Sequence, residues 1–335
     1  MPTKIVVTDY LEPDFNWEKE QLRNRGFDFS WQEHQLKFAS EEELAPAIRE
    51  ADVLVVNMAR MTAGVIGRLQ NCKLIIRHGI GYDNVDLAAA TAKGIRVANI
   101  PDYCVGEVAE QTVMLIMCAA RHLVEQQVSM AASVAKGQWD FSPVAPVGLM
   151  EGKTLGIVGC GRIGSRVLRK MRSFDMKILV CDPYLSPESR RELDVEPVSL
   201  EKVLAEADVL TLHIPVKDET RGLINKRTLA QMKKTALLVN TARGPLIVDE
   251  DLAAALAQGT IAGAALDVYH REPPSPDSPL LGSPKCLLTP HLSWYSEESG
   301  WSIREKILEN IILHLEGRPP RFTVNAEVEK ALARG

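Results

Sequence analysis

A glycine-rich loop, GCGRIG at residues 159–164, lies between an apolar run at 155–158 and an amphipathic segment at 162–171. In a strand–loop–helix unit of this kind, the first glycine makes a tight turn and the second lets the backbone approach a pyrophosphate. The third glycine lets the helix pack closely on the strand, and the N-terminal end of the helix holds the phosphate. The loop therefore predicts a parallel α/β domain that binds a dinucleotide. A glycine turn in another kind of α/β protein is the alternative.

An acidic residue ends the next predicted strand: Asp182, 18 positions after Gly164. Its carboxylate would accept hydrogen bonds from the adenosine ribose hydroxyls and would repel a 2′-phosphate. Pro183 and Tyr184 come next, so that no arginine adjoins Asp182 to bind such a phosphate. The sequence thus predicts NAD rather than NADP as the cofactor.

Short apolar runs alternate with helical patterns through two series. The runs of the first series are 5–7, 53–56, 74–76 and 95–97, and those of the second are 155–158, 178–180, 209–212, 236–239, 264–268 and 286–289. Strands that alternate with helices indicate βαβ units and parallel sheets. One long helical region, from about Cys104 to Lys136, separates the two series.

A final amphipathic helix carries apolar residues at helical spacing from Ile303 to Leu315, and Gly317 closes it. A single helix after a finished sheet cannot bury its apolar face alone, so we expect it to return to the first domain. The predicted fold class is therefore α/β, with two doubly wound parallel-sheet domains. A Rossmann NAD-binding domain, residues 102–295, is inserted in a flavodoxin-like domain, residues 1–101 and 296–335.

The charge and hydrophobicity of the chain exclude several classes of protein. The 335 residues carry a net charge of −5 without a basic block, so no nucleic-acid surface is indicated. Apolar stretches of five to eight residues are far short of a membrane span, and the N-terminus lacks the apolar core of a signal peptide. The six cysteines have no CxxC spacing, which favours reduced thiols over a disulfide or zinc framework. We therefore expect a cytoplasmic protein with no metal site.

Three polar segments follow predicted strands of the second series, at the carboxyl edge where ligands collect in a doubly wound sheet. They are NTARG at 240–244, a stretch from Asp267 to Pro273, and Thr-Pro-His at 289–291. With the glycine loop and RHGIGYDNVD at 77–86, these motifs make the sequence similar to the D-isomer-specific 2-hydroxyacid dehydrogenase family over essentially the whole chain. The segments DPYL at 182–185 and PHLSWYSE at 290–297 look most like its C-terminal-binding protein branch.

The resemblance implies an NAD-dependent dehydrogenase, or 2-keto-acid reductase, that moves a hydride between NAD(H) and C2 of a small 2-hydroxy or 2-keto acid. His291 would donate a proton to the carbonyl oxygen in reduction, because histidine titrates near working pH. Glu272 would hydrogen-bond the other ring nitrogen and favour the imidazolium. Arg243, which is permanently charged, would bind the substrate carboxylate and polarise the carbonyl. Each of the three residues, taken alone, could equally have a structural role. Their order along the chain favours the catalytic interpretation.

The same resemblance assigns further contacts. Substrate contacts are Arg77, His78, Gly79, Ile80, Arg243 and Trp294. Cofactor contacts are Gly159, Gly161, Arg162, Ile163, Gly164, Asp182, Pro183, His213, Pro215, Thr241, Ala242, Asp267 and Thr112. Asp267 would receive the nicotinamide carboxamide, and Trp294 would line the pocket for the substrate side chain. As alternatives, Arg77 forms a structural ion pair and His213 belongs to a structural turn. Thr112 and Trp294 are alternatively core residues.

A different class of function shares these site residues: an NAD-sensing interaction protein, like the C-terminal-binding proteins that act as transcriptional corepressors. Such a protein would need a peptide cleft in the first domain and a long disordered tail, whereas this chain ends ten residues after Asn325. Phosphoglycerate dehydrogenase is an alternative within the enzyme class. It is weakened because no regulatory domain follows and because Trp294 would narrow a pocket for a phosphate.

We also expect a homodimer. The helical region that begins at Cys104 carries apolar side chains on more than one face, including Val113, Met114, Met117 and Cys118. A two-fold contact would cover the face that its own domain leaves exposed.

Overall fold

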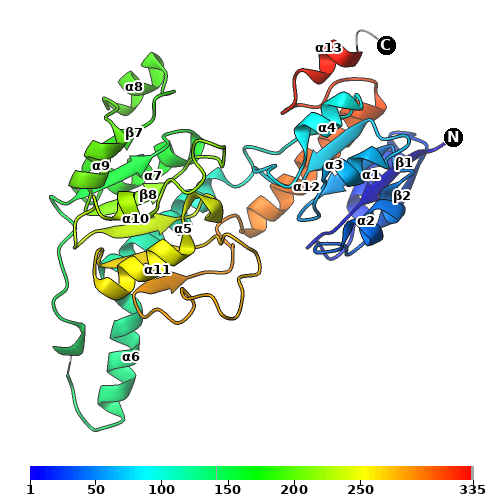
Figure 1. Ribbon diagram of the computed structural model, residues 1–335. Helices are drawn as coiled ribbons and strands as arrows, with labels where there is room; N and C mark the ends of the chain where they lie inside the picture. The colour runs from blue at the N-terminus through cyan, green and yellow to red at the C-terminus, as the bar shows by residue number, and fades with distance from the viewer. Residues whose placement is uncertain (141, 333–335) are drawn as a thin grey trace. The chain divides into compact units, whose positions relative to one another are not determined.

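The chain folds into two compact units (Figure 1). The structure is a computed structural model that describes residues 1–140 and 142–332. Unit 1 comprises Met1–Cys104 and Ser296–Gly335, and unit 2 comprises Val105–Tyr295. The first division follows Cys104, three residues after the boundary at 101 that the sequence suggested. Each unit is built on its own all-parallel sheet, so each is described by itself.

Unit 1 has a five-stranded sheet in the order β2-β1-β3-β4-β5. The strands are β1 (Thr3–Val7), β2 (Phe29–Glu33), β3 (Val53–Val56), β4 (Leu74–Arg77) and β5 (Arg96–Ala98). This is the flavodoxin-like order, which confirms the predicted fold of the first domain. Strand β2 was not expected, because it is an edge strand with no fully buried residue and lacks an apolar run.

Helices cover both faces of this sheet. They are α1 (Asn16–Asn24), α2 (Glu41–Ile48), α3 (Ala63–Gly67), α4 (Leu87–Ala92), α12 (Glu297–Leu315) and α13 (Val328–Leu332). Helix α12 packs Ile303, Ile307 and Ile311 in one apolar core with Ile5 and Val7 of β1. The last long helix therefore returns to the first domain, as its lone apolar face predicted.

Unit 2 has a six-stranded sheet in the order β11-β10-β9-β8-β6-β7. Its strands are β6 (Thr154–Val158), β7 (Lys177–Cys181), β8 (Val209–Leu212), β9 (Leu237–Asn240), β10 (Gly263–Leu266) and β11 (Cys286–Leu288). Its helices include α7 (Arg162–Arg172), α8 (Pro187–Leu193), α9 (Leu200–Glu206), α10 (Lys226–Leu229) and α11 (Asp249–Gln258), with 3₁₀ turns η1 (Ser142–Val144) and η2 (Gly244–Leu246). Strand order reverses between β6 and β8, which is where a doubly wound sheet binds its ligand.

In the six-stranded Rossmann order 3-2-1-4-5-6, two strands lie beyond the first strand at one end of the sheet. In unit 2, β6 takes the place of that first strand and only β7 lies beyond it. The chain returns to β7 at the place of the missing strand, where the Val198 amide donates to the Val180 carbonyl at 2.8 Å. No strand forms at this place, so β7 is the edge of the sheet among the described residues.

The region from Cys104 to Lys136 is two helices rather than one: α5 (Val105–Ala120) and α6 (Leu123–Val134). His122 lies between them with φ of 53°, a left-handed conformation that ends the first helix. The apolar periodicity continues across this break, which is why the sequence suggested a single element. Figure 1 shows α6 extending away from the rest of unit 2. Among the described residues, no helix is long and apolar enough to cross a lipid bilayer.

Candidate active site

The glycine loop connects β6 to α7 in a backbone conformation that side chains would prevent. Gly159 has φ of +88°, and a Cβ atom on it would lie 2.5 Å from the His213 carbonyl oxygen. A Cβ atom on Gly164 would lie 2.1 Å from the Gly159 carbonyl oxygen, so the third glycine permits the close helix–strand contact. Gly161 caps α7 without a side chain, and the first-turn N–H groups of Arg162 and Ile163 face outward from the helix end. The loop can thus receive a pyrophosphate.

Asp182 follows β7 with its carboxylate held beside the glycine loop. The Cys160 amide donates to Oδ2 at 2.8 Å, and the Tyr184 amide donates to Oδ1 at 2.9 Å. Each carboxylate oxygen can accept two hydrogen bonds, and each accepts one here. One acceptor position on each oxygen is therefore left for a ribose hydroxyl. Pro183 lies exposed between them. Asp182 thus provides a carboxylate acceptor at the position where an adenosine ribose would bind.

His213 and Pro215 follow β8 on the other side of the reversal. The His213 ring nitrogen Nε2 lies 3.1 Å from the Thr211 hydroxyl, and burial lowers the pKa of His213 to about 3. The ring is therefore neutral at physiological pH, which suits the uncharged adenine side of a dinucleotide rather than its phosphates. The Pro215 carbonyl accepts the Thr220 hydroxyl at 2.8 Å, which fixes the turn.

Thr112 occupies a core position, which was the alternative to a direct cofactor contact. Its side chain is fully buried on α5, and its hydroxyl bonds the Val108 carbonyl and the Thr241 hydroxyl, both at 2.7 Å. A fully buried hydroxyl can act on a cofactor only through its neighbour. Thr112 is therefore a support for Thr241, which with Ala242 begins the loop after β9.

Arg243 is held by a turn that the end of β9 builds. The Asn240 side chain accepts the Ala242 amide at 3.0 Å and donates to the Arg243 carbonyl at 2.8 Å. The Arg243 guanidinium donates to the Ala242 carbonyl at 2.7 Å. A Cβ atom on Gly244 would lie 1.9 Å from the Tyr269 carbonyl carbon, so only glycine lets this loop rest on the loop after β10. That second loop carries Glu272.

His291 and Glu272 form an ion pair. The His291 Nδ1 atom lies 2.6 Å from Glu272 Oε2, and the Tyr269 amide donates to Glu272 Oε1 at 3.0 Å. Burial alone would raise the pKa of Glu272, but the hydrogen bond and charge of His291, the Tyr269 amide and the charge of Arg243 together lower it. The carboxylate is ionised, and Nε2 is the ring atom left to meet a substrate. Arg243, Glu272 and His291 therefore lie in one electrostatic cluster within unit 2.

The loop that carries His291 is held by Asp267. His291 has φ of 54°, a left-handed conformation that is strained for a residue with a side chain. Asp267 is fully buried and accepts the Leu292 and Ser293 amides at 3.0 and 2.9 Å, and the Thr289 and Ser293 hydroxyls both at 2.5 Å. These four bonds occupy all four acceptor positions of the carboxylate. Asp267 therefore holds the histidine loop, and its contact with the nicotinamide carboxamide stays a prediction.

The expected substrate contacts at 77–80 form a local cluster in unit 1. The Arg77 guanidinium folds back and donates to the His78 carbonyl. It passes over Gly79, whose φ is +145° and where a Cβ atom would lie 1.9 Å from Arg77 Nη1. Ile80 is half-buried in the same turn. Trp294, by contrast, lies in unit 2, half-buried, with its ring edge-on to Tyr295 at a centroid distance of 5.3 Å.

Sequence reasoning missed the residues that hold these side chains in place: Asn240, Tyr269, Ser293 and Glu12. The sequence offered one signal for Asn240, because this polar residue directly follows the apolar run at 236–239. In the structure it ends β9 and is fully buried. Glu12 gave no signal, because its partner, His78, lies 66 residues away.

The family model of the D-isomer-specific 2-hydroxyacid dehydrogenase NAD-binding domain matches residues 113–293. A D-3-phosphoglycerate dehydrogenase of Methanocaldococcus jannaschii is 40% identical over 288 residues, which cover 85% of this chain and 54% of that protein. The chain thus spans about half the length of that relative. A hydroxypyruvate reductase of Blautia hydrogenotrophica is 35% identical over 324 residues, with 94% of this chain and 98% of that protein covered.

A solved structure extends the likeness to the whole fold. The D-lactate dehydrogenase of Aquifex aeolicus, complexed with NAD and lactic acid, superposes with a TM-score of 0.82 at 26% identity. The superposition covers 98% of each chain.

Proposed function

The chain belongs to the D-isomer-specific 2-hydroxyacid dehydrogenase family, and from that membership we propose that it is an NAD-dependent reductase of a small 2-keto acid. In the reverse direction it oxidises the CH–OH group of the corresponding 2-hydroxy acid. The observation that carries the proposal is the His291–Glu272 pair at 2.6 Å, coupled to Arg243 in the unit that holds the glycine loop. Proton donor, orienting carboxylate and fixed cation are the groups that keto-acid reduction needs.

The glycine loop and Asp182 fit NAD, and the bound cofactor would supply the hydride that reduces C2 of the keto acid. His291 donates the proton from Nε2 to the carbonyl oxygen, while Glu272 holds Nδ1 and stabilises the imidazolium. Arg243 binds the carboxylate and draws electron density from the carbonyl. In oxidation of the 2-hydroxy acid, the neutral His291 accepts the hydroxyl proton. The cluster at Arg77–Ile80 supplies further cationic and backbone contacts to the carboxylate.

The experiment that tests this function is an NADH-oxidation screen over 2-keto acids that differ in side-chain size and charge. Glyoxylate, pyruvate, hydroxypyruvate and phosphohydroxypyruvate cover the range, and the phosphorylated acid tests the phosphoglycerate dehydrogenase alternative. We expect an uncharged small acid to be the best substrate, since Trp294 carries no charge to meet a phosphate. If the protein reduced none of these acids and bound a partner protein instead, the interaction-protein alternative of the C-terminal-binding protein branch would be favoured.

Asp182 sets the cofactor preference. We predict that the protein uses NADH at least about tenfold more efficiently than NADPH, which corresponds to roughly 1.4 kcal/mol. In Asp182→Ala the gap should narrow, because the repulsion of a 2′-phosphate is gone and the Lys217 ammonium, 5.5 Å from the Tyr184 ring centroid, adjoins the same loop. Steady-state kinetics with both cofactors measure this. Equal efficiency in the parent protein would contradict the role of Asp182.

The oligomeric state is a further part of the proposal: a homodimer whose contact uses α6. Val113 and Met117 of α5, which the sequence suggested for this contact, pack against the core of their own unit. On α6, apolar side chains are exposed instead: Leu123, Val124, Val128, Met130 and Val134. A second copy of the chain would cover this stripe by an isologous contact.

Changing the α6 stripe tests the dimer. We expect Val128→Glu, which puts a charge on a side chain that is 65% exposed, to leave the fold intact and to produce monomers. Glu125→Lys is the control, because Glu125 is an exposed residue of the same helix that lies outside this stripe, and it should stay dimeric. Light scattering at micromolar concentration gives the mass of each. A parent protein that is monomeric would contradict the proposal.

We place the enzyme in the cytoplasm, where thiols stay reduced. Its six cysteines are all free thiols, which supports that location. Fractionation of the source cells with a tagged protein tests it, and recovery from an oxidising compartment would count against it.

A further inference from the structure

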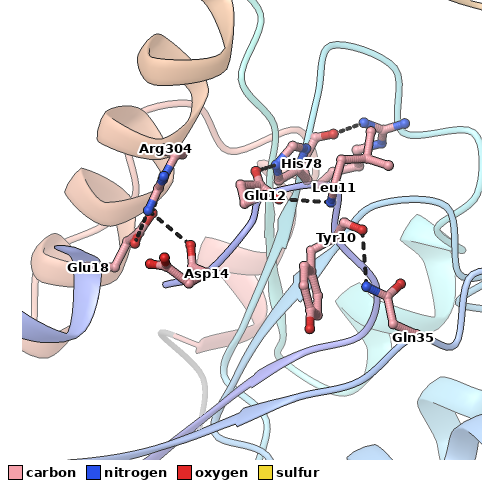
Figure 2. A network of polar contacts seen from close by, with 9 residues as sticks. Tyr10, Leu11, Glu12, Asp14, Glu18, Gln35, His78 and Arg304 are labelled. Atoms are coloured by element: carbon pink, nitrogen blue, oxygen red, sulfur yellow. Dashed lines mark hydrogen bonds and ion pairs between the residues drawn. The ribbon is translucent and has the colours of Figure 1, made fainter. Parts of the chain in front are cut away.

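Unit 1 holds a histidine–carboxylate pair of its own, formed by His78 and Glu12 (Figure 2). His78 Nε2 lies 2.5 Å from Glu12 Oε1, and the two side chains are only 6% and 9% exposed. The second Glu12 oxygen accepts the Leu11 amide at 3.0 Å. Burial alone would raise the pKa of Glu12, but the hydrogen bond and charge of His78 lower it to about 2. Glu12 is therefore ionised at physiological pH and is held by His78.

His78 is the residue on which the 77–80 turn rests. It directly follows β4, and its amide donates to the Val56 carbonyl at 2.8 Å. Its carbonyl accepts the Arg77 guanidinium, which crosses Gly79 to reach it. That carbonyl is therefore one of the groups that hold the Arg77 guanidinium over Gly79. The side chain of His78 is the third point that fixes the residue, and Glu12 is the partner that holds it.

Two carboxylates of the loop after β1 connect three loops at the carboxyl edge of the unit 1 sheet. Asp9 accepts the Met58 and Ala59 amides at 2.7 and 3.2 Å, which joins this loop to the loop after β3. Glu12 joins it to the turn after β4 through His78. Of the two, only Glu12 contacts the turn that carries Arg77.

We propose that Glu12 and His78 are positioning residues for the carboxylate of the 2-keto acid. The pair fixes the His78 carbonyl, which in turn fixes the Arg77 guanidinium over Gly79 as a cation for that carboxylate. This inference rests on the proposed function. Because the pair acts on substrate binding and not on proton transfer, its loss raises KM for the keto acid. It leaves kcat and the KM for NADH within about twofold of the parent values.

A neighbouring ion pair provides a matched control. Figure 2 shows Arg304 of α12 beside Glu18 of α1, with Nε–Oε1 and Nη2–Oε2 distances of 2.6 and 2.8 Å. The Glu18 side chain, at 2% exposed, is even more buried than that of Glu12. Glu18 pairs with Arg304 and not with His78, so a change there costs stability while the Glu12–His78 hydrogen bond keeps both of its partners.

The test compares Glu12→Leu, Glu18→Leu and the conservative Glu12→Gln. Phe15 and Ile307 line the same small cavity as Glu12, so we expect a leucine to be accommodated there and the variant to fold. We expect Glu12→Leu to raise KM for the best keto acid about tenfold, which corresponds to about 1.4 kcal/mol. Glu12→Gln retains an acceptor for the His78 N–H and should recover most of the parent KM. Glu18→Leu should lower the melting temperature at least as much with KM unchanged.

A double variant tests whether the pair acts as one unit. Glu12→Leu combined with His78→Leu should give the KM of the single Glu12→Leu change, since the second change removes nothing further. An unchanged KM in Glu12→Leu, or an equal rise in Glu18→Leu, overturns the inference while the proposed function stands if the parent reduces a keto acid. A parent that reduces no keto acid overturns both.

Discussion

Replacing His291 with alanine is expected to lower turnover of the best keto acid by about 10²–10⁴-fold. The variant loses the proton donor to the carbonyl oxygen, and its partner Glu272 cannot replace it, because Glu272 is ionised and has no proton to donate. The glycine loop and Asp182 are untouched, so we expect the affinity for NADH to stay within about twofold. Stopped-flow turnover and NADH fluorescence titration measure the two quantities separately.

His270→Ala is the matched control for this change. His270 is an exposed histidine on the neighbouring loop of unit 2, so the same substitution removes an imidazole that the mechanism does not use. Its turnover should match that of the parent. If His291→Ala kept the parent rate, the proton donor would have to be another group.

Replacing Glu272 with glutamine is expected to slow reduction about 10–10²-fold at neutral pH and to move its pH profile toward lower pH. The ionised Glu272 attracts a positive charge on His291, and this attraction also lowers the pKa of Glu272. Glutamine keeps the shape without the charge, so protonated His291 is less favoured at any given pH. Initial rates across the pH range measure the shift.

Glu192→Gln serves as the control, since Glu192 pairs with Arg169 on the surface of unit 2 and does not touch the site. The parent profile should be retained in that variant. A Glu272→Gln profile that moved to higher pH, or did not move, would mean that the charge of Glu272 does not act on His291.

Much of the fold could be predicted because it depends on local pattern. The buried runs of β6, β8 and β9 are continuous and apolar, and each became a strand within about two residues of its expected ends. β2 escaped prediction because a half-buried edge strand lacks such a run. The break at His122 also escaped, since apolar periodicity does not register a single left-handed residue.

The candidate site divides in the same way. Arg243, Glu272 and His291 were found from motifs at strand ends, where the sheet brings them together. The part that Asp267 takes in holding the histidine loop was not predicted, because its four donors come from 22 to 26 residues further along and depend on how the loop folds. The sequence left a cofactor contact and a core position open for Thr112, because its burial is decided by the packing of α5 on the sheet. A short sequence motif can therefore single out residues such as Asp267 and Thr112, but it does not show which groups they form hydrogen bonds with.

The most direct test of the mechanism follows the hydride. NADH with deuterium at both C4 positions is incubated with the parent protein and the best keto acid whose product is chiral, such as pyruvate or hydroxypyruvate, and the product is analysed by mass spectrometry and chiral chromatography. The family and the site predict a 2-hydroxy acid of the D configuration that carries deuterium on C2. A product without deuterium on C2, or of the L configuration, would contradict a direct hydride transfer of this stereochemistry.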